Sequence, residues 1–276
     1  MDWWFTAQAI ILDTAGRFAI APEKQSAAPV DDEEAEKQSD ARRATEEEWK
    51  EFLRLIATTR KHCPVNGLLL VIPATSLLRD SDELIQRKGR DLARFLDNTR
   101  RTPEVRFPVF VLITKADLIP GFREFFTHIH DVDLTQQMFG WSKPGGLDEP
   151  FEPEEIDKYL NEVRARLERR RLALISDPVH SRIPGGRRVD EVDALFTFPQ
   201  RFAQLAPRLR SYLRLVFVKS KFNQAPLFLR GIYFTSSLEQ GAEIDEVIAR
   251  QLGVTLKQLA ESGAGYRKER PLFLKD

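Results

Sequence analysis

The 276-residue chain has a single cysteine, no apolar run long enough to span a bilayer, and no net charge. Its one thiol, Cys63, excludes an internal disulfide and any cysteine-based metal cluster. Its longest apolar stretch, residues 67–73, falls far short of the ~18–20 residues that a transmembrane helix needs. Lys plus Arg and Asp plus Glu both number 42, so no overall field attracts nucleic acid or an anionic membrane. We therefore expect no nucleic-acid partner, and membrane attachment only through segments outside this chain.

The sequence also lacks a phosphate-binding loop of the form G-x-x-x-x-G-K-[ST]. The turn Pro184-Gly185-Gly186-Arg187 is rich in glycine, but no apolar strand precedes it. Without such a loop the chain lacks the amide cradle and the lysine that hold the β- and γ-phosphates of a nucleotide. We therefore expect no cofactor in this chain and no nucleotide hydrolysis by it. The four histidines, His62, His128, His130 and His180, form no convincing metal set.

Apolar runs alternate with amphipathic segments along the first 114 residues. Strands that are buried on both faces form continuous apolar runs, so this alternation predicts an α/β fold with a parallel sheet covered on both faces. The polar residues 22–43 predict a solvated loop, and Thr45 and Glu48 then have the spacing of a capping box at the start of a helix. The predicted strands are residues 5–12, 66–73, 107–114 and 227–235.

About one hundred residues separate the third and fourth predicted strands, which is far more than an ordinary connection in an α/β sheet. The spacing of apolar residues predicts helices over 122–129, 154–175 and 198–218, with a break near Pro207. We therefore predict a helical insert, residues 122–220, within an α/β core of residues 1–121 and 221–276. Segments 141–150 and 178–189 read as loops, and residues 244–252 as a short helix. The arginines between 164 and 171 alternate with glutamates and indicate a solvated or protein-binding helix face.

The first candidate site follows the first apolar run, at Asp13-Thr14-Ala15-Gly16. An acid at the end of a strand can hold Mg²⁺ beside a nucleotide phosphate, which makes Asp13 the candidate metal ligand. Gly16 would let its backbone N–H approach the terminal phosphate closely. An ordinary strand-to-turn junction explains the same residues equally well, because Asp and Gly both favour turns.

The second candidate site is Thr114-Lys115-Ala116-Asp117, at the end of the third predicted strand. The carboxylate of Asp117 could accept two hydrogen bonds from the edge of guanine, and the Lys115 stem could lie along the base. Ser236, after the last predicted strand, is a third and weaker candidate. Parallel strands end at one edge of a sheet, so these loops and the Asp13 loop should meet there. Alone, Thr114 to Asp117 could equally be a helix cap.

With these residues in view, the chain resembles the IcmF/TssM family of type VI secretion proteins. The Asp-Thr-Ala-Gly and Thr-Lys-Ala-Asp motifs are shared with many NTPases, whereas the other matches make the resemblance specific. The matching stretches are Asp2-Trp3-Trp4-Phe5, residues 12–17, Pro64-Val65-Asn66-Gly67, residues 114–122, Phe198-Pro199-Gln200, residues 230–236 and residues 270–276.

The resemblance implies a core like that of P-loop NTPases, and specifically of G-domains, without the phosphate loop. It also implies a large bacterial inner-membrane protein whose transmembrane helices, phosphate loop and periplasmic part lie outside this chain. This segment would lie at the cytoplasmic face of the inner membrane and contact baseplate and membrane-complex proteins. The nucleotide site of the family would fall on Asp13, Gly16, Thr114, Lys115, Asp117 and Ser236.

Two functions remain open at this stage. The chain is a non-enzymatic scaffold and docking domain, or it belongs to a GTPase or ATPase that binds GTP or ATP with Mg²⁺ only in a longer protein. In a G-domain the strand of the phosphate loop lies between the strand before Asp13 and the strand at residues 66–73. Without it, we expect these two strands to pair directly or to borrow a strand from a partner, because unpaired buried edges are costly.

Overall fold

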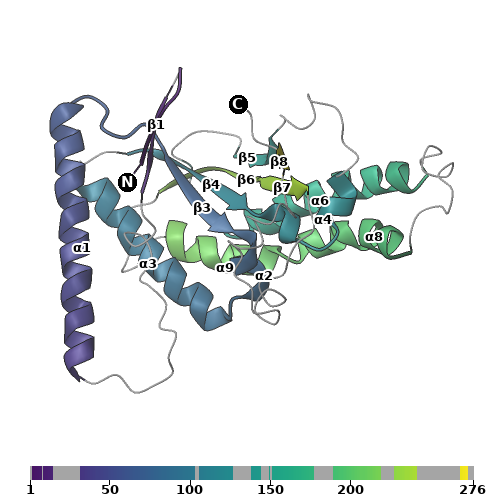
Figure 1. The fold of residues 1–276 in the computed structure, drawn as a ribbon, viewed down its shortest axis with the longest axis horizontal. Coiled ribbons are helices and arrows are strands. Elements are labelled where there is room, and N and C mark those ends of the chain that lie inside the picture. Colours follow the sequence, from purple (N-terminus) through teal and green to yellow (C-terminus); the bar gives the residue numbers. More distant parts are fainter. Residues whose placement is uncertain are drawn as a thin grey trace, which may run out of the picture.

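The computed structural model describes residues 2–7, 9–14, 32–102, 106–126, 138–143, 149, 151–176, 189–218, 227–240 and 268–272. This part of the chain is α/β, as predicted (Figure 1). Its central sheet has four strands in the order β3-β4-β6-β5. Strands β3 (Leu68–Pro73), β4 (Pro108–Thr114) and β6 (Phe228–Phe234) are parallel, and β5 (Phe139–Ser142) pairs antiparallel with β6. The sheet is therefore mixed rather than fully parallel.

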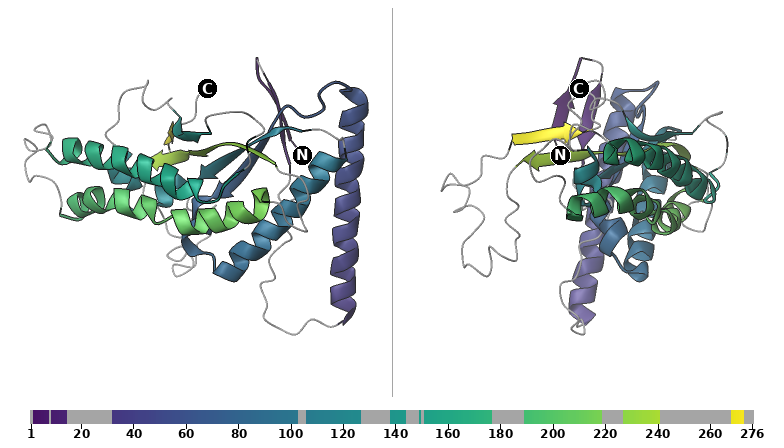
Figure 2. Two further views of the ribbon diagram at one scale, coloured as in Figure 1. Left: turned by 180° about the vertical axis from the view of Figure 1, so that it is seen from behind. Right: turned by 90° about the vertical axis from the view of Figure 1, so that its right-hand side faces the viewer.

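Helices α3 and α9 lie along one face of the sheet, and α6 and α8 run side by side beyond its end (Figures 1 and 2). A single hydrophobic cluster joins the strands to these helices, so Val109 and Val111 pack in the same core as Leu209 and Leu213. The division into a core and an insert stays a prediction. The helices are α1 (Asp32–Thr59), α2 (Ala74–Arg79), α3 (Asp82–Arg101), the 3-10 turn η2 (Ala116–Leu118), α4 (Phe122–Phe126), α6 (Glu155–Ile175), α8 (Val189–Ala203) and α9 (Ala206–Phe217).

Several helix boundaries follow from local chemistry. Ser81 caps α3, because its side chain accepts a hydrogen bond from the amide of Leu84 at 3.3 Å. The predicted break near Pro207 is confirmed, since α8 ends at Ala203 and α9 starts with Pro207 in its first turn. Gly121 turns the chain into α4 with φ of 92°, a value that an L side chain rarely adopts.

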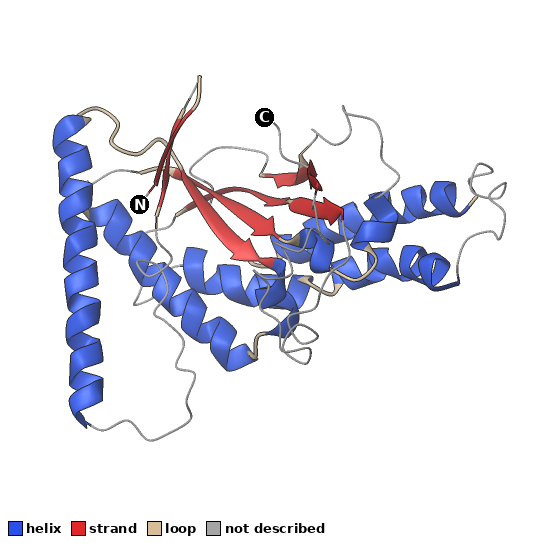
Figure 3. Ribbon diagram, in the orientation of Figure 1, coloured by secondary structure: helices blue, strands red, loops and turns tan. Residues whose placement is uncertain are grey.

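Within the part of the chain that the structure describes, one face of the sheet is more deeply buried than the other, and the predicted cover on both faces stays a prediction. The side chains of Val109, Val111 and Ile113 point into the core, whereas Leu69 and Val71 of β3 are 55% and 53% exposed. Helices α3 and α9 lie below the sheet in the view of Figure 3, and α1 stands apart at its side. Buried and more exposed side chains therefore alternate along β4, as they do in a sheet with one face packed on the core.

The first apolar run does not form the predicted buried strand. Strands β1 (Asp2–Phe5) and β2 (Ile10–Asp13) make an antiparallel hairpin that forms a separate two-stranded sheet. Its turn is tied by Thr6, whose hydroxyl lies 3.0 Å from the carbonyl of Ala9. In the described sheets β2 has β1 as its only neighbour, and Ile10 and Ile11 are exposed while Leu12 is half-buried.

Helix α1 starts at Asp32, so residues 32–43 are helical and not the predicted loop. Thr45 lies inside this helix and does not cap it. Pairs at helical spacing along α1, such as Lys50 with Glu46 at 3.3 Å, support a helix in a polar sequence. Trp49 attaches α1 to α3 through a 3.0 Å hydrogen bond to Thr99.

Other predictions have mixed outcomes. Residues 141 and 142, predicted as loop, belong to β5, so the segment predicted as a helical insert also contributes a strand to the sheet. Strands β7 (Ser236–Gln240) and β8 (Lys268–Leu272) form a further antiparallel pair. The predictions for residues 127–129, 178–188 and 244–252 lie outside the described residues. Within the described ranges, no helix is both long enough and apolar enough to cross a membrane.

Candidate functional site

The loops after β4 and β6 meet at the carboxyl edge of the sheet, as their positions in the sequence predicted. The amide of Thr235 donates to the carbonyl of Ile113 at 2.9 Å, and the amide of Ala116 donates to the carbonyl of Thr235 at 3.1 Å. These bonds continue the pairing of β4 with β6 past the ends of both strands. They place Asp117 and Ser236 side by side.

We call the place where these two loops meet, residues 114–117 and 235–236, the corner. Asp117 lies at its centre, and both of its carboxylate oxygens have partners within the chain. Ser236 donates its hydroxyl to Oδ1 at 2.7 Å, and Arg123 of α4 donates to Oδ2 at 3.2 Å. The Asp117 side chain is 11% exposed and that of Arg123 is 32% exposed. A carboxylate that accepts two donors in this way is held in place.

Lys115 adopts a left-handed backbone conformation, with φ of 56°, and it is the one non-glycine residue with positive φ in the described part of the chain. This conformation is costly for a lysine and is often found where function demands it. The side chain of Lys115 is exposed, while Thr114 before it is half-buried at the end of β4. The strained backbone of Lys115 marks the corner as a candidate site, but it does not identify a ligand.

The first candidate motif lies elsewhere. Asp13 ends β2, which is not a strand of the central sheet, and its side chain is exposed. Its register partner is Asp2. Gly16 lies outside the described residues. The structure therefore does not align Asp13 with Asp117 along one sheet edge, and the assignment of Asp13 to Mg²⁺ stays a prediction. In the part of the chain that can be described, no group of three or more His, Cys, Asp or Glu could hold a metal ion.

Arg123 is the residue that sequence reasoning missed. It lies six positions after Asp117, and its approach depends on the turn at Gly121 that starts α4. The sequence carried no signal for this contact, because no motif links an arginine at that spacing to the Thr-Lys-Ala-Asp loop. It places a cation directly beside the carboxylate of Asp117.

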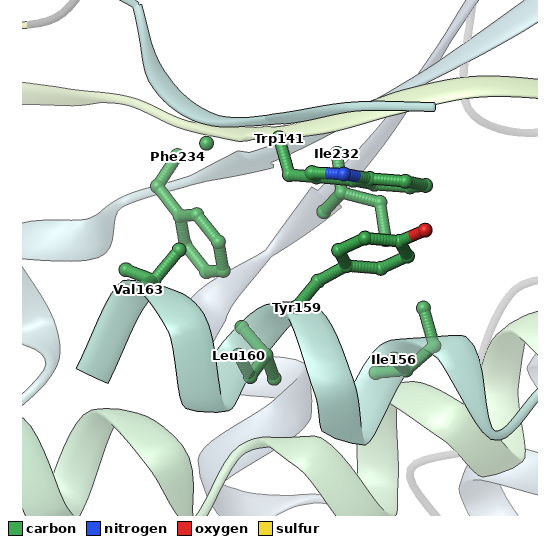
Figure 4. A pocket seen from close by; sticks show the side chains of 8 residues that line it. Trp141, Ile156, Tyr159, Leu160, Val163, Ile232 and Phe234 are labelled. Atoms are coloured by element: carbon green, nitrogen blue, oxygen red, sulfur yellow. The ribbon is translucent and has the colours of Figure 1, made fainter. Parts of the chain in front are cut away.

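The two best-formed pockets in the described structure do not include Asp117, Lys115 or Ser236. One pocket, between β5, β6 and α6, has a cavity volume of only about 10 Å³, far below the ~300 Å³ at which ligand pockets usually begin. Trp141 and Tyr159 line it, and the centroids of their stacked rings lie 3.4 Å apart (Figure 4). The other pocket has a volume of about 390 Å³ and is lined by Pro153, Glu154, Arg210, Ser211 and Arg214.

Comparisons with known proteins identify relatives by sequence alone. The model of the IcmF-related N-terminal domain matches residues 42–276. The type VI secretion system component TssM1 of Pseudomonas aeruginosa is 32% identical over 268 residues, which is 96% of this chain. The chain spans 22% of the length of that relative. No solved structure matches the chain.

Proposed function

Because the chain belongs to the IcmF/TssM family of type VI secretion proteins, we propose that it is a scaffold and docking domain of the secretion apparatus. It would lie at the cytoplasmic face of the bacterial inner membrane, anchored by other parts of a longer protein. Its partners would be baseplate and membrane-complex proteins. The core would derive from a P-loop NTPase of the G-domain type that has lost, within this segment, the means to hold phosphates.

The observation that carries this proposal is the internal satisfaction of Asp117. Ser236 and Arg123 each donate to one carboxylate oxygen, so a base would have to share this carboxylate with two groups of the chain. The same contacts tie η2, α4 and β7 together, so the corner supports the fold. No phosphate loop is present in the sequence to add affinity. Because the Asp117 carboxylate already holds parts of the fold together, this site supports docking better than nucleotide turnover.

The docking surface that we favour is the pair of helices α6 and α8, which project beyond the sheet (Figure 1). Phe196 is 57% exposed on α8, and the guanidinium of Arg171 on α6 stacks over it at 4.5 Å. Arg171 also donates to the carbonyl of Phe196 at 3.0 Å. An exposed aromatic ring with an arginine locked over it is typical of residues that carry binding energy at protein interfaces.

Substitution on the surface tests this better than deletion, because removing residues 122–220 would also remove α9 and β5 from the shared core. We expect Phe196→Ala with Arg171→Ala in the full-length protein to reduce baseplate recruitment at least tenfold in cells. The matched control is Leu55→Ala on α1, which removes an equally exposed apolar side chain far from α6 and α8. Unchanged recruitment by the double variant would reject this surface.

A second function is favoured by one observation, the strained backbone of Lys115 beside Asp117. We propose as the alternative that the corner reads the base of GTP or ATP when an intact phosphate loop and Mg²⁺ are supplied by the longer protein. Binding would then require Arg123 to leave Asp117. Lys115 would lie along the base, with Thr114 and Ser236 completing the loop.

Calorimetric titration of the full-length protein with GTP, ATP and a non-hydrolysable analogue, in the presence of Mg²⁺, separates the two functions. The scaffold predicts no heat of binding for wild type, Arg123→Ala or Asp117→Ala. The alternative predicts binding that Asp117→Ala abolishes and that Arg123→Ala preserves or strengthens, because that variant frees the carboxylate. Micromolar binding with this pattern would replace the scaffold by a nucleotide switch.

A further inference from the structure

The second half of α6 carries a concentrated positive charge. Residues 164–175 contain five arginines and one glutamate, whereas residues 155–163 contain one lysine and three acidic residues. The guanidinium of Arg164 lies 3.7 Å from the carboxylate of Glu168, so this pair offsets one of the five positive charges. An excess of positive charge therefore remains on this half of the helix.

Arg166 and Arg169 hold their part of this charge on the outer side of α6. Both are exposed, whereas Val163 and Leu167 belong to the buried stripe of the same helix. Residues three positions apart are neighbours on a helix surface, so Arg166, Arg169 and Leu172 form one exposed line. The line thus runs from two cations to an apolar side chain.

Exposed apolar side chains lie at this end of the helix pair and are flanked by the arginines. Leu172 is 62% exposed and Ile175 is 38% exposed on α6. Arg171 lies one turn before Ile175, and its guanidinium covers the exposed ring of Phe196 on α8. The group that we call the arginine patch consists of Arg166, Arg169, Arg171, Leu172, Ile175 and Phe196.

Charge indicates what kind of surface can cover the arginine patch. Guanidinium groups bind carboxylates through two parallel hydrogen bonds, so an acidic partner fits the arginines. An anionic bilayer is broader and would also meet the exposed Asp193, which lies one turn before Phe196 on the same side of α8. A single acidic segment that lies along α6 avoids this repulsion. The observations therefore favour a protein segment over a membrane.

We propose that the arginine patch binds an acidic amphipathic helix of a partner protein, in which Asp or Glu residues flank a row of apolar side chains. The carboxylates pair with Arg166 and Arg169, and the apolar row covers Leu172, Ile175 and Phe196. This inference rests on the proposed function, because it names the chemistry of the partner at the α6–α8 docking surface.

Fluorescence anisotropy of labelled peptides tests this chemistry on the full-length protein in phosphatidylcholine nanodiscs. The probes are three designed helical peptides of equal length and pattern, made of Glu with Leu, of Lys with Leu, and of Glu with Ala. The charge variant carries Arg166→Glu and Arg169→Glu, and the apolar variant carries Leu172→Ser and Ile175→Ser. All four side chains are exposed, so the fold should be retained, which circular dichroism would check.

The matched control carries Arg54→Glu and Lys61→Glu, which make the same change in net charge at two exposed positions. Arg54 belongs to α1, at the opposite end of the molecule from α6 and α8 (Figure 1). We expect wild type and the control to bind the Glu/Leu peptide at least tenfold more tightly than either other peptide. High salt should reduce the preference for Glu over Lys.

Each variant should lose one preference. The charge variant should no longer prefer Glu over Lys, and the apolar variant should no longer prefer Leu over Ala. A wild type without the preference for Glu, or a charge variant that binds like wild type, would overturn the proposal. Displacement of the Glu/Leu peptide by vesicles that contain phosphatidylglycerol, but not by phosphatidylcholine vesicles, would also overturn it in favour of a membrane contact.

Baseplate recruitment in cells separates failure of this inference from failure of the proposed function. If the variant with Phe196→Ala and Arg171→Ala recruits less baseplate while wild type shows no preference among the peptides, only the acidic partner is rejected. If recruitment is unchanged, the docking surface itself is rejected, and the acidic partner at that surface is rejected with it.

Discussion

The hydroxyl of Ser236 donates to Oδ1 of Asp117 at 2.7 Å, although 119 positions separate the two residues. This bond joins the loop after β4 to the start of β7. Arg123 reaches the other carboxylate oxygen from α4. One side chain thus connects the end of the sheet with the first helix of the segment that follows it. The corner is a structural junction whatever else it binds.

Disrupting this junction should lower stability in a non-additive way. We expect Ser236→Ala and Asp117→Ala each to lower the free energy of unfolding by ~1–3 kcal/mol, because each leaves a polar partner unsatisfied. The double variant should cost at least ~0.5 kcal/mol less than the sum, since both changes break one hydrogen bond. Urea denaturation of the four proteins measures this coupling. Asp193→Ala, at an exposed carboxylate on α8, is the control, and strictly additive costs would mean that the bond contributes nothing.

Gly121 should tolerate no side chain. Its φ is 92°, and an added Cβ would lie 2.7 Å from the carbonyl oxygen of Ala194 and 2.8 Å from Cβ of Phe198. We expect Gly121→Ala to lower the free energy of unfolding by more than ~2 kcal/mol, through backbone strain and displacement of α8. The matched control is Gly67→Ala, whose Cβ would meet its nearest atom at 3.5 Å and should change stability by less than ~1 kcal/mol. Equal effects at both positions would contradict this account.

The pairing of Asp117 with Ser236 could be predicted because it depends on one rule, that parallel strands end at a common edge. The contact of Arg123 could not, because it depends on the direction in which Gly121 sends the chain after η2. The exposed hairpin was missed for a different reason. An apolar run such as Ile10-Ile11-Leu12 shows that burial is favourable, but it does not show whether a neighbouring strand is available.

Helix α1 was mispredicted at its start because polar residues suit both a solvated loop and a solvated helix. Acidic and basic residues at helical spacing, such as Glu46 and Lys50, stabilise the helix. Trp49 and Leu53 are buried residues in its last third. The sequence therefore located the part of α1 that packs on α3, whereas the start of the helix could be assigned only from the structure.

The attachment of α1 should depend on Trp49. Its indole donates to Thr99 at 3.0 Å, and its ring lies 5.0 Å from that of Phe95 on α3. We expect Trp49→Ala to release α1, so that its amides exchange at least tenfold faster while the amides of β4 and β6 keep their protection. Hydrogen exchange followed by mass spectrometry resolves the two regions. Leu55→Ala, at an exposed position of the same helix, should leave α1 protected, and loss of protection throughout the sheet would show that α1 is part of the global core.

Tyr212 should make stability sensitive to alkaline pH. It is 2% exposed, and burial, reinforced by the charges of Asp80 and Asp91, raises the pKa of its hydroxyl above the ordinary value of about 10. The unfolded chain therefore loses this proton first as the pH rises. The contribution of Tyr212 to the free energy of unfolding is therefore constant below about pH 10. It falls above that pH, because only the unfolded state is then stabilised by ionisation of the hydroxyl. Tyr212→Phe removes the effect.

The difference between wild type and Tyr212→Phe isolates this residue, because every other titrating group is common to both proteins. We expect urea denaturation to give a constant difference in unfolding free energy from neutral pH to about pH 9. Above about pH 10 the wild type should lose up to ~1.4 kcal/mol per pH unit relative to the variant. Curves that stay parallel through this range would mean that Tyr212 ionises equally easily in both states, and that its burial does not resist deprotonation.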